Sequence, residues 1–291
     1  MLLPLKGKIA IITGANQGLG LEISHKYIKA GASLVMCARN IDLLQKAQAK
    51  LTHNLTTGQV IEVVSIDVSN AGSVEQLANF AIQRFERIDI LVNNAGIYGP
   101  MGTIEMIDWA EWVKAIEINL FGSILMCKAV LPIMKKQNKG KIIQLSGGGA
   151  TNPMPNISAY AVSKAAIVRF AETLAEEVRE FHIDVNSIAP GSLNTRMLDE
   201  VLNAGPEKVG QAFFDKSLQQ KETGGTGLNF CADLALFLAS NASNGITAKL
   251  ISALWDQWDH WPEHLEELDS TDIYTLRRIT GRDRGFSWGD K

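Results

Sequence analysis

Short runs rich in β-branched and aliphatic residues alternate along most of the chain with longer segments of helical periodicity. Runs that are apolar on both faces suit parallel strands covered by helices, which are joined by right-handed helical crossovers. The alternation therefore predicts an α/β fold with a doubly wound parallel sheet of Rossmann type. We expect buried strands at residues 8–13, 33–38, 60–67, 88–93, 141–146 and 184–188. Ligands of such sheets bind beyond the carboxyl ends of the strands, so functional residues should follow each run.

Composition narrows the class of protein. Apolar residues make up 46% of the 291 residues, which is enough for a full globular core. The 28 basic and 31 acidic side chains give a net charge of -3, which is too balanced for a general nucleic-acid binder. We expect a small-molecule partner and no nucleic acid.

The cysteines and the apolar stretches indicate the cellular compartment in which the protein is expected. Cys37, Cys127 and Cys231 are odd in number, widely spaced and set among apolar residues, so we expect core thiols rather than disulfides or metal ligands. No stretch suggests a signal peptide or an uninterrupted membrane span. The expected location is the cytoplasm, with no membrane partner.

No linker divides the first 250 residues, so one catalytic domain is expected over residues 1–254. Residues 198–227 mix charges, Pro206 and a glycine cluster, which suits a mobile flap over a cleft. Residues 255–291 form an appended tail with three tryptophans near its start, which we expect to pack on the domain or to line a substrate pocket. The acidic and histidine side chains between Asp256 and His264 superficially resemble metal ligands, but a solvated segment is the preferred interpretation.

A glycine-rich stretch, Thr13 to Gly20, follows the first expected strand and opens a helix that runs from Leu21 toward Ala30. Gly14, Gly18 and Gly20 permit a tight turn and a close approach of the backbone. The helix N-terminus offers unpaired N–H groups and a partial positive charge to a pyrophosphate. The arrangement predicts a dinucleotide site.

The end of the second strand bears on the choice of dinucleotide. Ala38 stands where an acid for the ribose hydroxyls is expected, and Arg39 follows it, so NADP is favoured over NAD. The alternative is that Arg39 is solvated and that Asp42 supplies the acid. Asp67 ends the third strand and Asn93–Gly96 end the fourth, so both are expected to contact adenine and ribose.

Tyr160 and Lys164 lie four residues apart in the segment 159–180, whose apolar spacing predicts a helix. They therefore share one helix face. A nearby ammonium in a sheltered cleft favours phenolate, so the pair is a candidate proton donor with a lowered tyrosine pKa.

Four motifs in this order resemble those of the short-chain dehydrogenase/reductase family. They are TGxxxGxG at Thr13–Gly20, NNAG at Asn93–Gly96, YxxxK at Tyr160–Lys164, and a PG turn with Thr195 after the sixth strand. The resemblance covers about residues 5–255.

The resemblance implies an oxidoreductase with Tyr160 as general acid/base on a carbonyl or alcohol. It implies that Lys164 holds the nicotinamide ribose, that Asn119 kinks its helix and anchors a proton relay, and that Leu193 and Thr195 bind the carboxamide. The full set of expected cofactor residues is Gly14, Asn16, Gly18, Leu19, Gly20, Arg39, Asp67, Val68, Asn94, Ala95, Gly96, Tyr160, Lys164, Pro190, Gly191, Leu193 and Thr195.

One position departs from the family. The serine that binds the substrate oxygen normally stands thirteen residues before the tyrosine, where this chain has Gly147, and Ser146 is one residue earlier. An offset of one turns a strand side chain to the other face, so Ser146 fits only if the loop carries an extra residue. We assign Ser146 as the catalytic serine, with Thr151 or Ser158 as substitutes.

Two other functions stay open. One is a nucleotide sensor or scaffold with reduced catalysis, and the other is an NAD-dependent dehydrogenase or epimerase of a sugar-like substrate. The resemblance also implies a homodimer or homotetramer, with Leu125, Val130, Val168 and Leu174 available for the contact.

Overall fold

The computed structural model describes residues 3–288, and within them seven parallel strands form one sheet. The strands are β1 Ile9–Thr13, β2 Ser33–Ala38, β3 Ile61–Ser65, β4 Ile90–Asn93, β5 Gly140–Leu145, β6 Ile183–Ala189 and β7 Leu250–Ser252. Their order across the sheet is β3-β2-β1-β4-β5-β6-β7. The doubly wound Rossmann-type fold is confirmed. Each of the six expected strands begins and ends within two residues of the bounds expected from the sequence.

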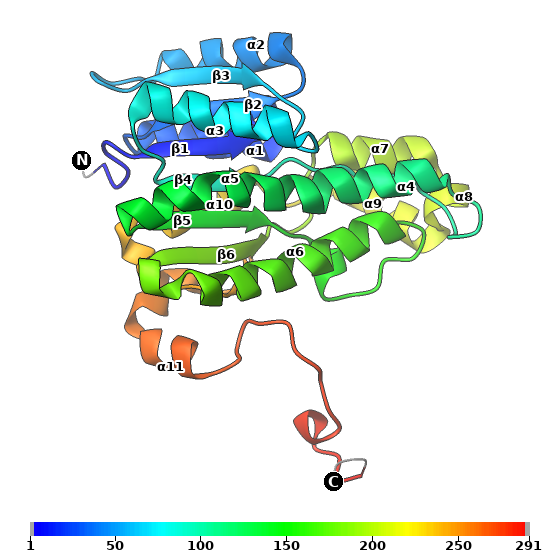
Figure 1. Ribbon diagram of the computed structural model, residues 1–291. Coiled ribbons are helices and arrows are strands. Elements are labelled where there is room, and N and C mark those ends of the chain that lie inside the picture. The colour runs from blue at the N-terminus through cyan, green and yellow to red at the C-terminus, as the bar shows by residue number, and fades with distance from the viewer. Residues whose placement is uncertain (1–2, 289–291) are drawn as a thin grey trace.

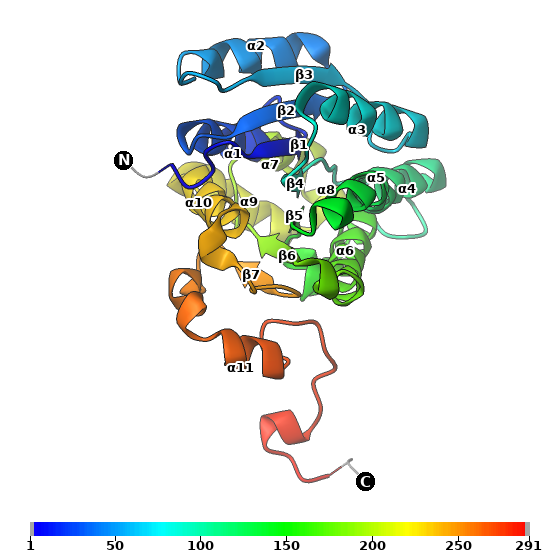
Figure 2. The ribbon, with the colours of Figure 1, turned by 60° about the vertical axis from the view of Figure 1, so that its left-hand side comes forward.

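Two helical layers cover the sheet (Figures 1 and 2). One core packs α1, α2 and α10 on one face, and the other packs α3, α5 and α6 on the opposite face. Successive residues of β1 serve opposite cores, Ile11 one and Ile12 the other, which is why the strand is apolar throughout. The helices are α1 Gly18–Lys29, α2 Ile41–Thr52, α3 Ala71–Phe85, α4 Trp109–Ile116, α5 Gly122–Gln137, α6 Ser158–Glu177, α7 Arg196–Ala204, α8 Pro206–Val209, α9 Gln211–Thr223, α10 Leu228–Ala239 and α11 Leu265–Ser270.

The three cysteines are free and buried, as expected. Of the side chains expected to be available for a dimer contact, Val130, Val168 and Leu174 are buried in their own subunit. That expectation was wrong for these three, because apolar spacing on α5 and α6 marks the face that packs on the sheet.

A π-helical turn, Glu117–Phe121, joins α4 to α5 into one long helix. The joined helix, Trp109–Gln137, is long and apolar enough to cross a membrane by length and composition, since an 18-residue window within it has a mean hydropathy of 1.6. Met126, Val130 and Met134 on one face of it are buried against the sheet. A helix that packs in the core of a folded domain can be as apolar as a membrane-spanning helix, and this packing accounts for the composition of Trp109–Gln137.

The segment expected to be a flap is mostly helical. Residues 196–223 form α7, α8 and α9, with Gly205 and Gly210 at the two breaks. Both glycines have positive φ, 78° and 84°, a conformation that other residues rarely adopt. The flap is therefore a set of short helices beside the carboxyl ends of the strands rather than a loose loop (Figure 1).

The tail leaves the body beyond β7, and its last part extends away from the domain (Figures 1 and 2). Lys249 donates to the carbonyl oxygens of Thr271 and Ile273, and the Leu250 amide donates to the Tyr274 carbonyl. Farther on, the Leu276 amide donates to the Glu172 carboxylate on α6 at 2.7 Å. Residues 271–276 thus cover the open edge of the sheet, which otherwise exposes unpaired backbone groups. The expected tail also includes residues 289–291, which lie outside the described residues.

Candidate active site

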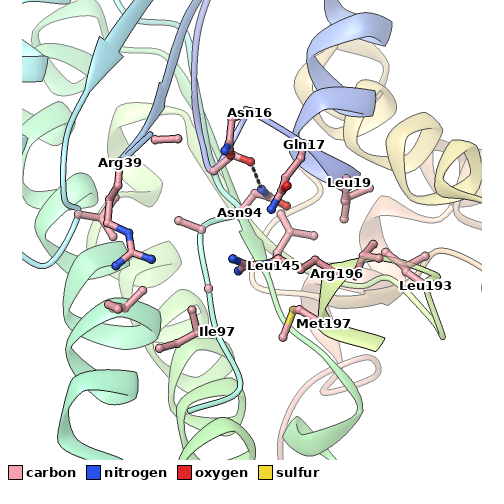
Figure 3. Close-up of a pocket in the computed structure, with 18 of the residues that line it drawn as sticks. Asn16, Gln17, Leu19, Arg39, Asn94, Ile97, Leu145, Leu193, Arg196 and Met197 are labelled. Carbon is pink, nitrogen blue, oxygen red and sulfur yellow. Dashed lines mark hydrogen bonds between the residues drawn. The ribbon is translucent and has the colours of Figure 1, made fainter. Parts of the chain in front are cut away.

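One cavity of about 1010 Å³ lies beyond the carboxyl ends of the strands. Its lining brings together the glycine loop after β1, the residues after β2, β3 and β4, and Tyr160 and Lys164 of α6. Its volume lies at the upper end of the range for small-molecule and cofactor sites. In Figure 3, Asn16, Gln17 and Leu19 form one wall, Arg39 enters from β2, and Arg196 and Met197 lie at the far end.

The glycine loop is shaped for close approach to a ligand. Gly14 and Gly18 have positive φ, 64° and 55°. A Cβ on Gly20 would lie 2.5 Å from the Gly14 carbonyl oxygen and 2.5 Å from the Asn94 amide nitrogen, so only glycine fits. Gln17 caps α1 without a side-chain hydrogen bond to the first turn. The N-terminus of α1 is therefore free of a competing side-chain acceptor, which suits a pyrophosphate.

The NNAG turn holds that loop in place. The Asn94 side chain donates to the carbonyl oxygens of Thr13 at 2.9 Å and of Gly14 at 3.2 Å. The backbone amides of Asn94 and Ala95 both donate to the Thr13 hydroxyl at 3.0 Å. These bonds tie the end of β4 to the end of β1, so the two motifs act as one cradle.

Arg39 and Asp67 face the same end of the cavity. Burial of Asp67 acts to raise its pKa, but hydrogen bonds from Ser69 and the charges of Lys114 and Arg39 outweigh burial and lower it. Asp67 is thus charged at neutral pH. Asp42, the alternative acid, lies exposed in the first turn of α2 and is not among the described residues that line the cavity.

Asn119 lies in the π-helical turn between α4 and α5. Its Oδ1 accepts from the Ile97 amide and its Nδ2 donates to the Ile97 carbonyl oxygen, both at 2.8 Å. It also donates to the Ser163 hydroxyl at 3.0 Å. Asn119 therefore fixes the strand end after the NNAG turn to α6.

Tyr160 and Lys164 share one face of α6, with the Lys164 Nζ 5.6 Å from the centre of the Tyr160 ring. Burial lowers the pKa of Lys164 to about 8, and its ammonium donates to the Leu145 carbonyl oxygen at 2.6 Å. Burial, and after it the neighbouring phenol Tyr98, raise the pKa of Tyr160 well above its ordinary value. Our expectation of a lowered pKa was wrong for this structure, because desolvation of the phenol dominates.

The position opposite the Tyr160 hydroxyl is Gly147. A Cβ on Gly147 would lie 2.4 Å from that hydroxyl. Ser146 lines the cavity, but its own hydroxyl donates to the Lys164 carbonyl oxygen at 3.3 Å. In this structure Gly147, and not Ser146, faces the Tyr160 hydroxyl, which does not support the assignment of Ser146 as the catalytic serine.

Most of the remaining expected cofactor residues also line the cavity, whereas Gly20 and Gly191 support it from outside. Gly191 has a φ of 83° and packs on Thr226, and Thr195 approaches Gly18. The cavity also includes residues that we did not predict, namely Gln17, Ala38, Asn40, Leu43, Ile66, Ile97, Ile118, Leu145, Asn194, Arg196, Met197 and Asp199. The strand-end rule could have found Ile66, Ile97 and Leu145, but α7 carries no such signal.

The tail contributes nothing to the cavity among residues 3–288. Trp261 is buried and packs on Tyr274, Trp258 packs on Phe237, and Trp255 is exposed. No cluster of three or more potential metal ligands occurs in the described part of the chain.

Comparison with known proteins gives the same family along most of the chain. The family model for short chain dehydrogenase matches residues 8–205. The chain is 33% identical to dehydrogenase/reductase SDR family member 4 of Caenorhabditis elegans, covering 84% of this chain and 93% of the relative. It is 34% identical to 7alpha-hydroxysteroid dehydrogenase of Escherichia coli strain K12, covering 86% and 94%.

Solved structures agree in fold. Levodione reductase superposes with a TM-score of 0.78 at 27% identity, covering 85% of this chain and 96% of that one. NAD+-bound xylitol dehydrogenase also gives 0.78, at 26% identity, covering 85% and 98%. Given the dinucleotide cradle and the Tyr160/Lys164 pair in one cavity, the chain belongs to the short-chain dehydrogenase/reductase family of oxidoreductases.

Proposed function

We propose that this protein interconverts a ketone and a secondary alcohol with NADP(H), with Tyr160 as the general acid/base. The observation that carries the proposal is that the glycine loop, Arg39, Tyr160 and Lys164 all line one cavity. Enzymes that use nicotinamide need a pyrophosphate cradle and a proton donor in one site, and this cavity contains both.

The residues fit a phosphorylated dinucleotide. The glycine loop that lines the cavity, and the first turn of α1 without a side-chain cap, suit the pyrophosphate. Arg39 at the opposite wall offers a guanidinium to a 2′-phosphate, and we assign adenine and ribose to Asp67, Val68 and Asn94–Gly96, which line the same cavity. We assign the carboxamide to Pro190, Leu193 and Thr195, which line the same cavity. Gly191 shapes the turn between them.

When bound, the cofactor supplies or accepts a hydride at its nicotinamide ring. The raised pKa of Tyr160 keeps its phenol protonated at neutral pH. A protonated phenol can donate to the far more basic alkoxide that develops as a carbonyl is reduced. Lys164 lies on the same face of α6, where its ammonium supports the ribose and stabilises the phenolate left behind.

Asn119 and Ser163 link the start of α6, which carries Tyr160, to the loop at Ile97. The Ser163 hydroxyl donates to the Tyr160 carbonyl oxygen at 2.7 Å and accepts from Asn119. We assign Asn119 a positioning role, because it holds the strand end at Ile97 and the start of α6 in one register.

A sensor or scaffold function is the second candidate, and Gly147 is the observation that favours it. This chain lacks a side-chain hydroxyl where the family has its substrate-binding serine. Such a protein binds NADPH without consuming it.

A screen at 340 nm tests both candidates. Purified protein is combined with NADPH or NADH and with polyols, keto sugars and acyl ketones. The oxidoreductase proposal expects cofactor turnover with at least one class and a preference for the phosphorylated cofactor. Fluorescence quenching of NADPH with no oxidation across the panel supports the sensor, and isomerised product without net cofactor change supports an epimerase.

We also propose that the protein is a cytoplasmic homo-oligomer. Free buried thiols suit a reducing compartment. Ile104, Met106 and Trp109 are exposed by 62%, 80% and 66% near the start of α4, which gives a second copy an apolar surface to cover. A purely monomeric species in sedimentation at micromolar concentration contradicts the oligomer.

A further inference from the structure

The Tyr160 hydroxyl faces backbone where the family places a serine. A Cβ at Gly147 would lie 2.4 Å from the hydroxyl oxygen and 3.3 Å from the ring carbon that carries it. A serine at this position would have to displace the phenol. With Tyr160 in its observed position, this chain therefore has no room for a side-chain hydrogen-bond donor at position 147.

The nearby hydroxyls and amides are engaged elsewhere. The Ser146 hydroxyl is bound to the Lys164 carbonyl oxygen, and Ser158 accepts from the Trp112 indole at 3.1 Å. Thr151 is exposed and accepts from Asn152. The Asn119 side chain forms its hydrogen bonds with Ile97 and Ser163. The two substitutes considered from the sequence, Thr151 and Ser158, are thus not directed at the phenol.

A second phenol, Tyr98, packs on the Tyr160 ring. The two ring centroids are 4.7 Å apart with a tilt of 56°. Tyr98 follows the NNAG turn directly after Ile97, which Asn119 holds at both its amide and its carbonyl. The two phenols interact electrostatically, since Tyr98 contributes to the raised pKa of Tyr160. The ring of Tyr98 therefore lies beside Tyr160 on a loop that Asn119 holds at Ile97.

Tyr98 also remains a hydrogen-bond donor at all working pH values. Burial, and after it the charge of Glu200, raise the pKa of Tyr98 to about 12. Its hydroxyl therefore stays protonated, whereas a phenolate would repel a developing alkoxide. A neutral phenol that donates a hydrogen bond to the reacting oxygen is the kind of group that stabilises such a charge.

We propose that Tyr98 is a further catalytic residue, whose hydroxyl donates a hydrogen bond to the substrate oxygen in place of the missing serine. The inference rests on the proposed oxidoreductase function. As hydride adds to the carbonyl carbon, the C=O π electrons move to oxygen. The Tyr160 O–H bond breaks and the substrate O–H bond forms, leaving Tyr160 as phenolate. Tyr98 keeps its proton throughout and lowers the energy of the oxyanion.

The test compares Tyr98→Phe with Tyr98→Ala, using NADPH and butane-2,3-dione, a small activated ketone that needs no elaborate pocket. Tyr98→Phe keeps the ring against Tyr160 and removes only the hydroxyl. We expect kcat to fall about 100-fold in both variants, the loss typical of one oxyanion donor. The Kd for NADPH, from fluorescence quenching, and the thermal midpoint of Tyr98→Phe should stay at wild-type values.

A purely structural Tyr98 gives a different pattern. In that case Tyr98→Phe has wild-type kcat and only Tyr98→Ala is impaired, which overturns the inference. A Ser146→Ala loss larger than that of Tyr98→Phe also overturns it, because the donor is then Ser146. Gly147→Ser is expected to lower kcat by crowding Tyr160, and an increase contradicts the geometry.

Tyr160→Phe separates this inference from the proposed function. If Tyr160→Phe is inactive while Tyr98→Phe is fully active, the function stands and the role of Tyr98 fails. If wild-type protein turns over neither the dione nor any member of the carbonyl panel, both fail together.

Discussion

The two ends of the cavity are built in different ways. At the cofactor end, the shape comes from backbone: Gly14 and Gly18 in left-handed conformations, the absence of a side chain at Gly20, and carbonyl oxygens held by Asn94. At the end that we assign to the substrate, side chains dominate: Tyr160 and Lys164 line the cavity, and Tyr98 packs on Tyr160. Added atoms should therefore damage the first end, and removed functional groups the second.

Lys164 lies where the two ends meet, and its burial predicts the largest effect. Burial lowers its pKa from 10.5 to about 8. Between these values the unfolded chain binds a proton that the folded chain does not, so stability rises with pH in this window. The folded state is thus destabilised below pH 8 by about 3 kcal/mol relative to strongly alkaline solution.

Urea unfolding of wild type and Lys164→Met across pH 7 to 10 measures this contribution. The stability gained by the substitution should be largest below pH 8 and should shrink as pH rises. The buried thiols of Cys37 and Cys127, whose pKa burial raises to about 12, titrate with the opposite sign but cancel in the difference. A difference that is constant with pH contradicts a buried, partly neutral lysine.

Gly20→Ala tests the backbone cradle. The new Cβ meets a backbone oxygen at 2.5 Å, and overpacking of this kind costs about 1–3 kcal/mol. We expect NADPH to bind about 10- to 100-fold more weakly, as measured by fluorescence titration. Gly148→Ala is the matched control, because its Cβ would meet nothing within 4 Å. Equal affinities for the two variants would show that the cradle does not depend on the missing side chain.

Arg39→Gln sharpens the choice of cofactor and has the smallest expected effect. A hydrogen bond to a charged group contributes about 1.5–3 kcal/mol, and Arg39 is exposed, so we expect about a tenfold loss for NADPH. NADH should be unaffected. Arg84→Gln, whose guanidinium pairs with Glu62 away from the cavity, controls for charge. An unchanged NADPH affinity would contradict the assignment of Arg39 to the 2′-phosphate.

The cofactor end could be predicted from the sequence because its determinants are local. Gly14, Gly18 and Asn94 stand at fixed distances after strands whose apolar runs are visible, and parallel strand ends meet at one edge. The spacing of Tyr160 and Lys164 likewise needs only helical geometry. These parts depend on short stretches of chain.

The substrate end could not be predicted as well, because it depends on contacts between distant segments. Whether Ser146 or Gly147 faces Tyr160 is decided by one residue of register between β5 and α6. The packing of Tyr98 on Tyr160 joins the end of β4 to α6, and no local pattern marks it. The apolar residues of α5 and α6 were assigned to the wrong surface for the same reason.

The central claim is that the Tyr160 phenol is the proton donor beside a bound nicotinamide cofactor, and Tyr160→Phe tests it most directly. Kinetics with the best carbonyl substrate, combined with a cofactor titration, should show kcat reduced by about a thousandfold or more while the Kd for NADPH stays within twofold. A variant that keeps wild-type kcat contradicts the account.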